Sequence, residues 1–257
     1  MHIKIIGEGR PIVLIHGWGV SGKIWEEFAK LIMSKYKLYI IDLPGMGKSE
    51  IINPYKIDNL INEIHGLIPE RASIIGWSLG GLIAMKYCLK YTKNVNSLVC
   101  ISATPCFIKK HGWEYGVNKN FFLKFKKDLL NNWEKTLKKF FLLQIQKEEE
   151  KEEILKKLES DSINERPSTK EGLEKSLEIL EKVDIRENIK NINIPTLIIS
   201  GKQDTISDYK ASIWMQSQIK ESEIFIFDSA GHLPFISHQR KCYQLVKEFI
   251  KGSITND

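Results

Sequence analysis

The sequence lacks features that would direct the protein into a membrane or a secretory route. No apolar run in its 257 residues approaches the roughly 20 needed to span a bilayer. Residues 1–8 contain neither a long apolar region nor a small-residue cleavage site, so we expect no signal peptide. The four cysteines show no C-x-x-C spacing, which indicates reduced thiols and no metal site. We therefore expect a cytoplasmic protein without a membrane partner.

The chain carries a modest excess of positive charge, with a formal net charge of +6. This charge is not spread like a nucleic-acid footprint, because residues 109–139 alone hold nine lysines against three acids. We therefore expect no nucleic-acid partner. The local basic patch either attracts an acidic partner or substrate, or is a solvated lysine-rich helix face. The sequence leaves both interpretations open.

The length, with 42% hydrophobic and 27% charged residues, is typical of one large α/β domain. Short continuous apolar runs indicate strands that are buried on both faces of a parallel sheet. These runs are residues 12–15, 38–41, 73–75, 98–101, 196–199 and 224–227. Helical patterns lie between or after them, at residues 24–32, 57–68, 81–91 and 243–250. The alternation predicts a right-handed, mostly parallel, doubly wound sheet.

The alternation stops after the fourth apolar run. From there to about Asp184 the apolar residues follow helical spacing, and we predict no buried strand. The sequence therefore predicts a core from residues 1–105 and 185–257, interrupted by a helical lid over residues 106–184. Such an insertion emerges above the carboxyl ends of the strands, where open α/β sheets bind ligands. The charged run 147–153 is interpreted as a helix face or a turn between helices.

The pentapeptide Gly76-Trp77-Ser78-Leu79-Gly80 joins one apolar run to the helical pattern that follows. A strand, a sharp turn and a helix, with the pattern G-x-S-x-G at the turn, predict a nucleophile elbow. Glycines flank the serine because the turn is strained and leaves little room for a Cβ. We therefore predict that Ser78 is a nucleophile exposed above the carboxyl ends of the strands.

A serine nucleophile needs a base that takes its proton and an acid that orients the base. Asp204 and His232 fit these roles, since each follows a strand-like run and the chain order is serine, acid, histidine. Asp184 is an alternative acid, and Asp208 is expected to cap the helix after it. The remaining histidines lie where structural roles are typical: His2, His65, His111 and His238, with His16 treated below.

The turn His16-Gly17-Trp18-Gly19 follows the apolar run at residues 12–15. It is predicted to supply one backbone N–H of an oxyanion hole, that of Trp18. The other is expected from Leu79, the residue after the nucleophile. His16 is expected to hold the turn by hydrogen bonds and not to act as a base. Such a site needs no metal and no organic cofactor.

The segment Gly45-Met46-Gly47-Lys48-Ser49 ends like a phosphate-binding loop. The pattern G-x-x-x-x-G-K-[ST] would require a glycine at position 42, where the chain has Asp42. We therefore expect a structural turn after a core strand and no phosphate site.

With these features the chain resembles the α/β-hydrolase superfamily from end to end. Within it, the chain is similar to the pimeloyl-[acyl-carrier protein] methyl ester esterases of biotin synthesis. The segments that carry the resemblance are residues 16–19, 42–45, 76–82, 104–107, 177–186 and 231–238. The first three are shared by many hydrolases. Trp77, the Pro-Cys-Phe at residues 105–107 and the segment 177–186 are more specific to these esterases.

The resemblance implies a serine carboxylesterase that hydrolyses the methyl ester of pimeloyl-carrier protein through an acyl-enzyme. In the family, basic lid residues face the acidic carrier protein, and we expect a monomer with that partner. The family's substrate contacts match Trp18, Ser78, Leu79, Phe140, Phe141, Leu142, Leu143, Gln144 and His232. The positions of its carrier-protein contacts match Lys135, Lys138 and Lys139. The acids interleaved over residues 148–153 depart from the family pattern.

Other functions fit the same motifs. A general short- or medium-chain carboxylesterase, a thioesterase or a carbon–carbon bond hydrolase would share the elbow, because a fold does not determine function. A non-catalytic ligand-binding member would keep the pocket, but the full set of Ser78, Asp204 and His232 argues against it. A dehalogenase would have an aspartate at position 78.

Overall fold

The computed structural model describes residues 1–146, 151–160 and 168–253. The strands within these ranges form a seven-stranded sheet. The strand order is β1-β3-β2-β4-β5-β6-β7, with β1 antiparallel to β3 and the other neighbours parallel. The strands are β1 (Ile3–Ile6), β2 (Arg10–Ile15), β3 (Tyr36–Ile41), β4 (Ala72–Trp77), β5 (Val95–Ile101), β6 (Thr196–Gly201) and β7 (Ser222–Phe227). The predicted α/β class and mostly parallel doubly wound sheet are confirmed.

Strand β1 was not predicted from the sequence. It is a short edge strand that pairs Ile3 with Ile41 and Ile6 with Leu38, and its middle residues are exposed. Lys4 interrupts this short strand, so it lacks the continuous apolar run from which the other strands were predicted.

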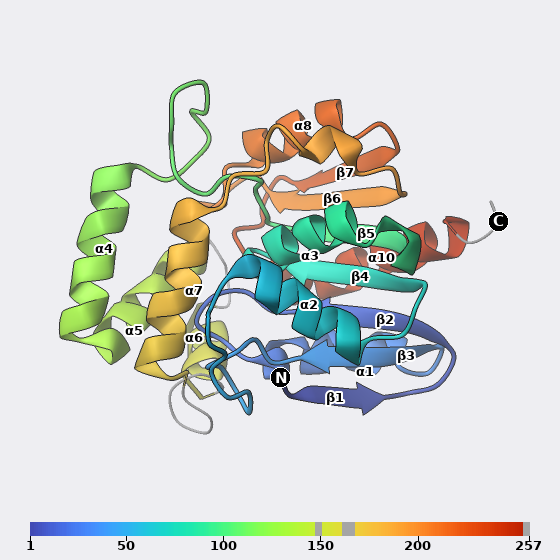
Figure 1. Ribbon diagram of the computed structural model, residues 1–257, viewed down its shortest axis with the longest axis horizontal. Coiled ribbons are helices and arrows are strands. Elements are labelled where there is room, and N and C mark those ends of the chain that lie inside the picture. Colours follow the sequence, from blue (N-terminus) through green and yellow to red (C-terminus); the bar gives the residue numbers. More distant parts are fainter. Residues whose placement is uncertain (147–150, 161–167, 254–257) are drawn as a thin grey trace.

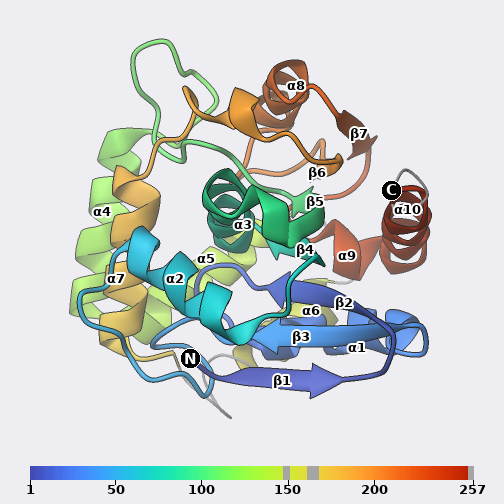
Figure 2. The ribbon, with the colours of Figure 1, turned by 45° about the vertical axis from the view of Figure 1, so that its right-hand side comes forward.

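Helices cover both faces of the sheet (Figures 1 and 2). One face carries α2 (Ile57–Leu67), α3 (Leu79–Lys90) and α8 (Tyr209–Gln218), and the other carries α1 (Glu26–Ile32) and α10 (Gln239–Gly252), preceded by the short α9 (Pro234–Ser237). Helix α2 shows why the pattern folds this way. Leu60, Ile61 and Ile64 recur at helical spacing and are fully buried, so the apolar stripe faces the sheet layer.

A second group of helices lies between β5 and β6 in sequence, beside the edge where the parallel strands end (Figure 1). These are α4 (Lys119–Asn131), α5 (Trp133–Gln144), α6 (Lys151–Glu159) and α7 (Lys170–Lys182). Asn132 separates α4 from α5, and its side chain caps α5 by accepting a hydrogen bond from the Lys135 N–H at 3.0 Å. The expected lid, residues 106–184, contains this group. Residues 147–150 of the charged run lie outside the described residues.

The turn after β3 joins the core to this lid. The carboxylate of Asp42 accepts hydrogen bonds from the backbone N–H groups of Gly22 at 2.7 Å and Lys48 at 2.9 Å. Helix α7 rests directly on the same turn, because a Cβ on Gly172 would lie 2.5 Å from the carbonyl oxygen of Gly45. The segment that ends like a phosphate loop is thus a structural turn, as predicted. None of the described helices is long and apolar enough to cross a membrane.

Candidate active site

Ser78 lies at the turn between β4 and α3, with φ 54° and ψ −116°. Residues other than glycine rarely adopt such a positive φ, so the backbone of the turn is strained. The flanking glycines make the turn possible. A Cβ on Gly76 would lie 2.4 Å from the carbonyl oxygen of Gly80, and a Cβ on Gly80 would lie 2.2 Å from that of Ile15. The segment therefore folds into an elbow that presents the serine at the carboxyl edge of the sheet.

The structure brings Ser78, His232 and Asp204 together. His232 Nε2 is 3.0 Å from Ser78 Oγ, and His232 Nδ1 is 2.7 Å from Asp204 Oδ2. The other carboxylate oxygen of Asp204 accepts the N–H groups of Ile206 at 2.8 Å and Ser207 at 3.0 Å. Because a carboxylate only accepts, the proton lies on Nδ1, and Nε2 is left to accept from Ser78. The histidine and aspartate side chains are 1% and 0% exposed, which strengthens these hydrogen bonds.

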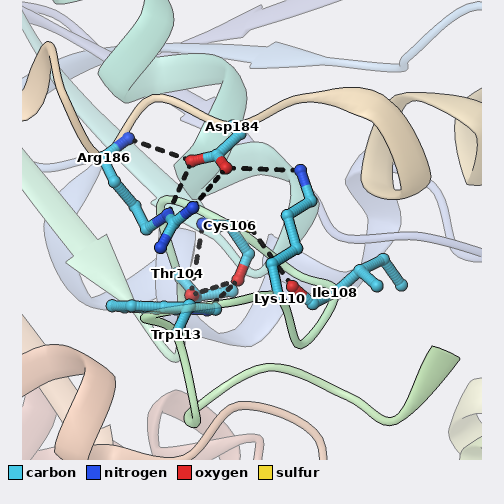
Figure 3. Close-up of polar contacts among 7 residues, drawn as sticks. All are labelled: Thr104, Cys106, Ile108, Lys110, Trp113, Asp184 and Arg186. Atoms are coloured by element: carbon cyan, nitrogen blue, oxygen red, sulfur yellow. Dashed lines mark hydrogen bonds and ion pairs between the residues drawn. The ribbon is translucent and has the colours of Figure 1, made fainter.

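The competing acids and histidines lie in other surroundings. Asp208 caps α8 by accepting the Lys210 N–H at 2.9 Å, as expected. Asp184, the alternative acid, is bonded to Arg186 at the end of the lid (Figure 3). Three other histidines make contacts away from the serine: His2 with Asp42, His65 with Tyr87 and Tyr91, and His238 with Ser229 and Ser237. His111 is exposed.

His16 holds the loop after β2, as predicted. Its Nε2 accepts a hydrogen bond from the Leu43 N–H at 2.9 Å, so the ring proton lies on Nδ1, which donates to the Gly17 carbonyl at 2.7 Å. Burial lowers the pKa of His16, and this outweighs the opposing effect of Asp42. The neutral ring therefore links two loops of the core.

Trp18 and Leu79, the expected oxyanion-hole residues, lie at the same edge of the sheet. Leu79 is the first residue of α3, where backbone N–H groups have no partner within the helix. Trp18 lines a cavity with Ser78, and its Nε1 donates to the Leu173 carbonyl of α7 at 3.0 Å. The tryptophan thereby connects the loop to the lid. The role of the two amides stays a prediction.

A cavity of about 400 Å³ opens onto Ser78 between the core and the lid. Its size lies within the range of about 300–1,000 Å³ that is usual for small-molecule sites. Apolar and aromatic side chains dominate its lining, among them Phe107, Phe122, Phe125, Phe140, Leu143 and Leu177. The arrangement can hold an apolar chain against the serine.

The five residues expected to bind substrate, 140–144, lie on α5, and their side chains point to different surroundings. Phe140 and Leu143 line the cavity. Phe141 is fully buried in the core, and Leu142 is 51% exposed in an adjoining groove that Leu143 also lines. The Gln144 carbonyl accepts the His232 N–H at 3.4 Å. The predicted contact run therefore narrows to Phe140 and Leu143 at the cavity wall.

The lysines expected to meet a carrier protein are all exposed on α5. Lys138 forms an ion pair with Glu159 of α6 at 3.5 Å, while Lys135 and Lys139 lie on the same exposed part of the helix. Of the interleaved acids, Glu152 and Glu153 lie in the first turn of α6. Glu148, Glu149 and Glu150 lie outside the described residues.

The loop of His232 has two further supports that the sequence did not reveal. Trp77 Nε1 donates to the His232 carbonyl at 2.9 Å, and the Gln144 carbonyl holds its N–H. In the sequence, the position of Trp77 directly before the serine was the one feature that pointed to such a contact, and it did not identify a hydrogen-bond partner. Within the described ranges, no group of three or more His, Cys, Asp or Glu side chains is arranged to hold a metal ion.

Comparisons with known proteins agree with this geometry. The alpha/beta hydrolase fold family matches residues 10–239. The chain is 34% identical to a pimeloyl-[acyl-carrier protein] methyl ester esterase from Wigglesworthia glossinidia brevipalpis, over 96% of each chain. It is 33% identical to the protein of that name from Legionella pneumophila (strain Corby), over 98% of this chain and 99% of the relative.

Among solved structures, the esterase EaEST from Exiguobacterium antarcticum superposes with a TM-score of 0.91. It is 25% identical, over 97% of this chain and 95% of that one. The family model, the relatives and the solved structure each match nearly the whole chain. The chain therefore belongs to the alpha/beta hydrolase fold family and, within it, groups with the carboxylic ester hydrolases.

Proposed function

We propose that the protein hydrolyses the methyl ester of pimeloyl-[acyl-carrier protein], through an acyl-enzyme on Ser78. The observation that carries the proposal is the hydrogen-bonded series Ser78, His232 and Asp204 at the base of an apolar cavity. The names of the relatives supply the substrate. The reaction would complete the pimelate stage of biotin synthesis, in the cytoplasm, with the protein acting as a monomer.

In the first half-reaction, His232 Nε2 removes the proton of Ser78 as Oγ attacks the ester carbonyl. The tetrahedral oxyanion is stabilised by the backbone N–H groups of Trp18 and Leu79, and one such donor contributes roughly 3–4 kcal/mol in other hydrolases. His232 then gives its proton to the methoxide oxygen, and methanol leaves. Asp204 holds the histidine tautomer and stabilises the imidazolium.

In the second half-reaction, water takes the place of methanol. His232 removes a proton from the water, which attacks the acyl carbonyl and forms a second tetrahedral oxyanion. The C–Oγ bond breaks, Ser78 recovers its proton from His232, and the free carboxylic acid leaves. These steps need no metal ion, because the oxyanion donors and the histidine carry the charge and the protons.

The cavity and the lid fit the two parts of such a substrate. An apolar acyl chain would lie along Phe125, Phe140 and Leu143, since these side chains wall the cavity beside the serine. The carrier protein is acidic, and the exposed lysines of α5 offer it a basic surface. We propose Lys135, Lys138 and Lys139 as the carrier-protein contacts.

The test is methanol release from methyl pimeloyl-carrier protein by the purified protein, followed with time. We expect multiple turnovers, and none with Ser78→Ala, whose thermal midpoint should match that of the parent. A short chromogenic ester and the same methyl ester without carrier protein are run in parallel. If the chromogenic ester is hydrolysed but the carrier-linked ester is not, the chain is an esterase with another substrate. Retained activity in Ser78→Ala would contradict the serine mechanism.

A further inference from the structure

One wall of the cavity is a segment without regular secondary structure. Residues 113–118, which we call the wall segment, contribute Glu114, Tyr115, Gly116, Val117 and Asn118 to the cavity lining. These residues precede α4, and residues 107–110 run beside them. An irregular segment can form a defined wall only if something else fixes it.

The wall segment is paired with the chain that leads into the lid. The Val117 N–H donates to the Phe107 carbonyl at 2.7 Å, and the Lys109 N–H donates to the Val117 carbonyl at 2.9 Å. The two backbones touch at Gly116, where a Cβ would lie 2.5 Å from the Ile108 carbonyl carbon. The position of the wall therefore follows the position of residues 107–110.

Asp184 fastens that leading segment to the end of the lid (Figure 3). Its carboxylate accepts Arg186 Nε at 2.9 Å, Arg186 Nη2 at 2.8 Å and Lys110 Nζ at 3.3 Å. The backbones are joined beside it, because Cys106 and Asp184 form an antiparallel bridge and the Ile185 N–H donates to the Pro105 carbonyl at 3.0 Å. We call Asp184, Arg186 and Lys110 the Asp184 cluster.

Trp113, the first residue of the wall segment, packs against the Asp184 cluster. The tryptophan is 1% exposed, and its Nε1 donates to the Cys106 carbonyl at 2.8 Å. The Arg186 guanidinium lies over its ring at 5.5 Å, and Trp214 of α8 meets it edge-on at 5.0 Å. The start of the wall segment is thus held between the lid end and the core.

The cluster is charged at ordinary pH. Burial alone would raise the pKa of Asp184, but hydrogen bonds from Arg186 and Lys110 outweigh it and hold that pKa well below its usual range. A carboxylate with a depressed pKa stabilises the fold above its unfolded pKa and loses that effect only as pH falls through the folded value. The fastening therefore persists throughout the neutral range.

From these contacts we infer that Asp184 is a positioning residue that sets the acyl-chain preference of the esterase by fixing the wall segment. It acts through Lys110, Arg186 and Trp113 and does not touch the substrate. Ser78 and residues 114–118 line the same cavity of about 400 Å³, so a medium-length acyl chain that fills it would contact the wall segment, whereas an acetyl group would occupy only a small part of it. The inference rests on the esterase function proposed above, but not on the identity of the natural substrate.

Asp184→Asn tests the inference, because it keeps the size of the side chain and removes the charge. We expect KM for p-nitrophenyl octanoate to rise roughly five-fold, with kcat and the acetate kinetics within about two-fold of the parent. Hydrogen exchange of residues 107–118 should become faster. The matched control is Glu181→Gln, which breaks the α4–α7 ion pair with Lys126. Glu181 and Asp184 are 25% and 24% exposed, so the two changes remove similar groups.

The control should leave the octanoate KM and the exchange of residues 107–118 unchanged. The inference would be overturned if Asp184→Asn and Glu181→Gln changed KM equally, or if Asp184→Asn affected the octanoate and acetate esters equally. Either result would mean that the cluster only contributes to the general stability of the lid. An unchanged octanoate KM would also overturn the inference. If Asp184→Asn does not fold, Lys110→Met and Trp113→Phe replace it in the same test. For these variants too, KM for the octanoate ester should rise while the acetate kinetics stay near the parental values. Failure to hydrolyse methyl pimeloyl-carrier protein would refute the proposed substrate alone, since the chromogenic esters report the cluster independently.

Discussion

Trp77 and His232 are joined by a hydrogen bond from the indole Nε1 to the histidine carbonyl, at 2.9 Å. The rings also meet, with centroids 5.4 Å apart. The residue before the proposed nucleophile therefore holds the loop of the proposed base. This bond joins the ends of β4 and β7, which are not neighbours in the sheet. Sequence order alone could not reveal it.

Trp77→Phe should lower kcat by about ten-fold and change KM little, because a displaced histidine loop disturbs proton transfer more than binding. The matched control is Trp25→Phe. Trp25 is also buried and packs on Phe235, as Trp77 does, but its Nε1 has no hydrogen-bond partner among the described residues. The control should lose some stability and keep kcat within about two-fold. Steady-state kinetics and thermal midpoints of both variants decide the matter, and equal kcat values would contradict this role.

Asp204→Asn should lose roughly 10⁴-fold in kcat, by analogy with serine proteases, because the histidine is left in the wrong tautomer. His232→Ala should be about as damaging as Ser78→Ala, since the three residues act as a unit. The measurement is single-turnover acylation with a chromogenic ester. Asp184→Asn, which leaves the proposed catalytic acid Asp204 in place, should retain its acetate kinetics. A nearly normal Asp204→Asn beside an inactive Asp184→Asn would mean that the acid is Asp184.

Much of the site follows from one rule, that loops after parallel strands meet at a common sheet edge. The rule brings Ser78, Asp204 and His232 together although up to 154 residues separate them. It says nothing about side-chain hydrogen bonds between loops, so Trp77 had no assigned partner. It is also silent on the Asp184 cluster, which depends on where a long insertion leaves and rejoins the core.

The run from residue 140 to 144 shows a different limit. The resemblance marked all five residues as contacts, yet a helix turns 100° per residue and cannot direct a continuous run into one cavity. Helical spacing directs Phe140 and Leu143 to the cavity at Ser78, whereas Leu142 lines only the adjoining groove, which Leu143 also borders. Applying the helical period to the run would have made this division from the sequence.

Phe140→Asp should raise KM for a medium-chain ester at least about ten-fold and affect an acetate ester far less, because it places a charge in the wall of the acyl cavity. Leu142→Asp is the matched control on the same helix. Its side chain is 51% exposed and does not line the cavity at Ser78, so KM for both esters should stay near the parental value. Equal losses for both esters in Phe140→Asp would indicate damage to the lid as a whole.

His16 should make stability fall as the solution is acidified. Its pKa is lowered in the fold from about 6.5, so the unfolded chain binds a proton first as pH falls. The stabilisation is complete above that unfolded pKa and is lost as pH drops towards the folded one. Between about pH 7.5 and 5.5 the thermal midpoint should decrease, by about 2–4 °C for each kcal/mol lost. In His16→Gln, which does not titrate, this decrease should be smaller, and an identical slope would exclude His16 as its source.

The exposed lysines of α5 should speed the encounter with an acidic carrier protein. Individual exposed pairs contribute little, often below about 1 kcal/mol, but a cluster attracts a partner before contact. Combining Lys135→Glu, Lys138→Glu and Lys139→Glu should therefore lower kcat/KM for methyl pimeloyl-carrier protein by about ten-fold or more. A small chromogenic ester should be hydrolysed almost normally, because the lysines lie outside the residues that line the cavity.

The control for net charge is a variant with Lys220→Glu, Lys241→Glu and Lys251→Glu, three exposed lysines outside the lid. It changes the total charge equally and should keep most of the carrier-linked activity. Added salt should slow the parent on the carrier-linked ester and affect the α5 variant less, because screening removes an attraction that the variant has already lost. Equal losses in the two triple variants would assign the effect to overall charge. A parent rate that is insensitive to salt would mean that the basic patch is only a solvated helix face, and the carrier protein would then have to be recognised elsewhere.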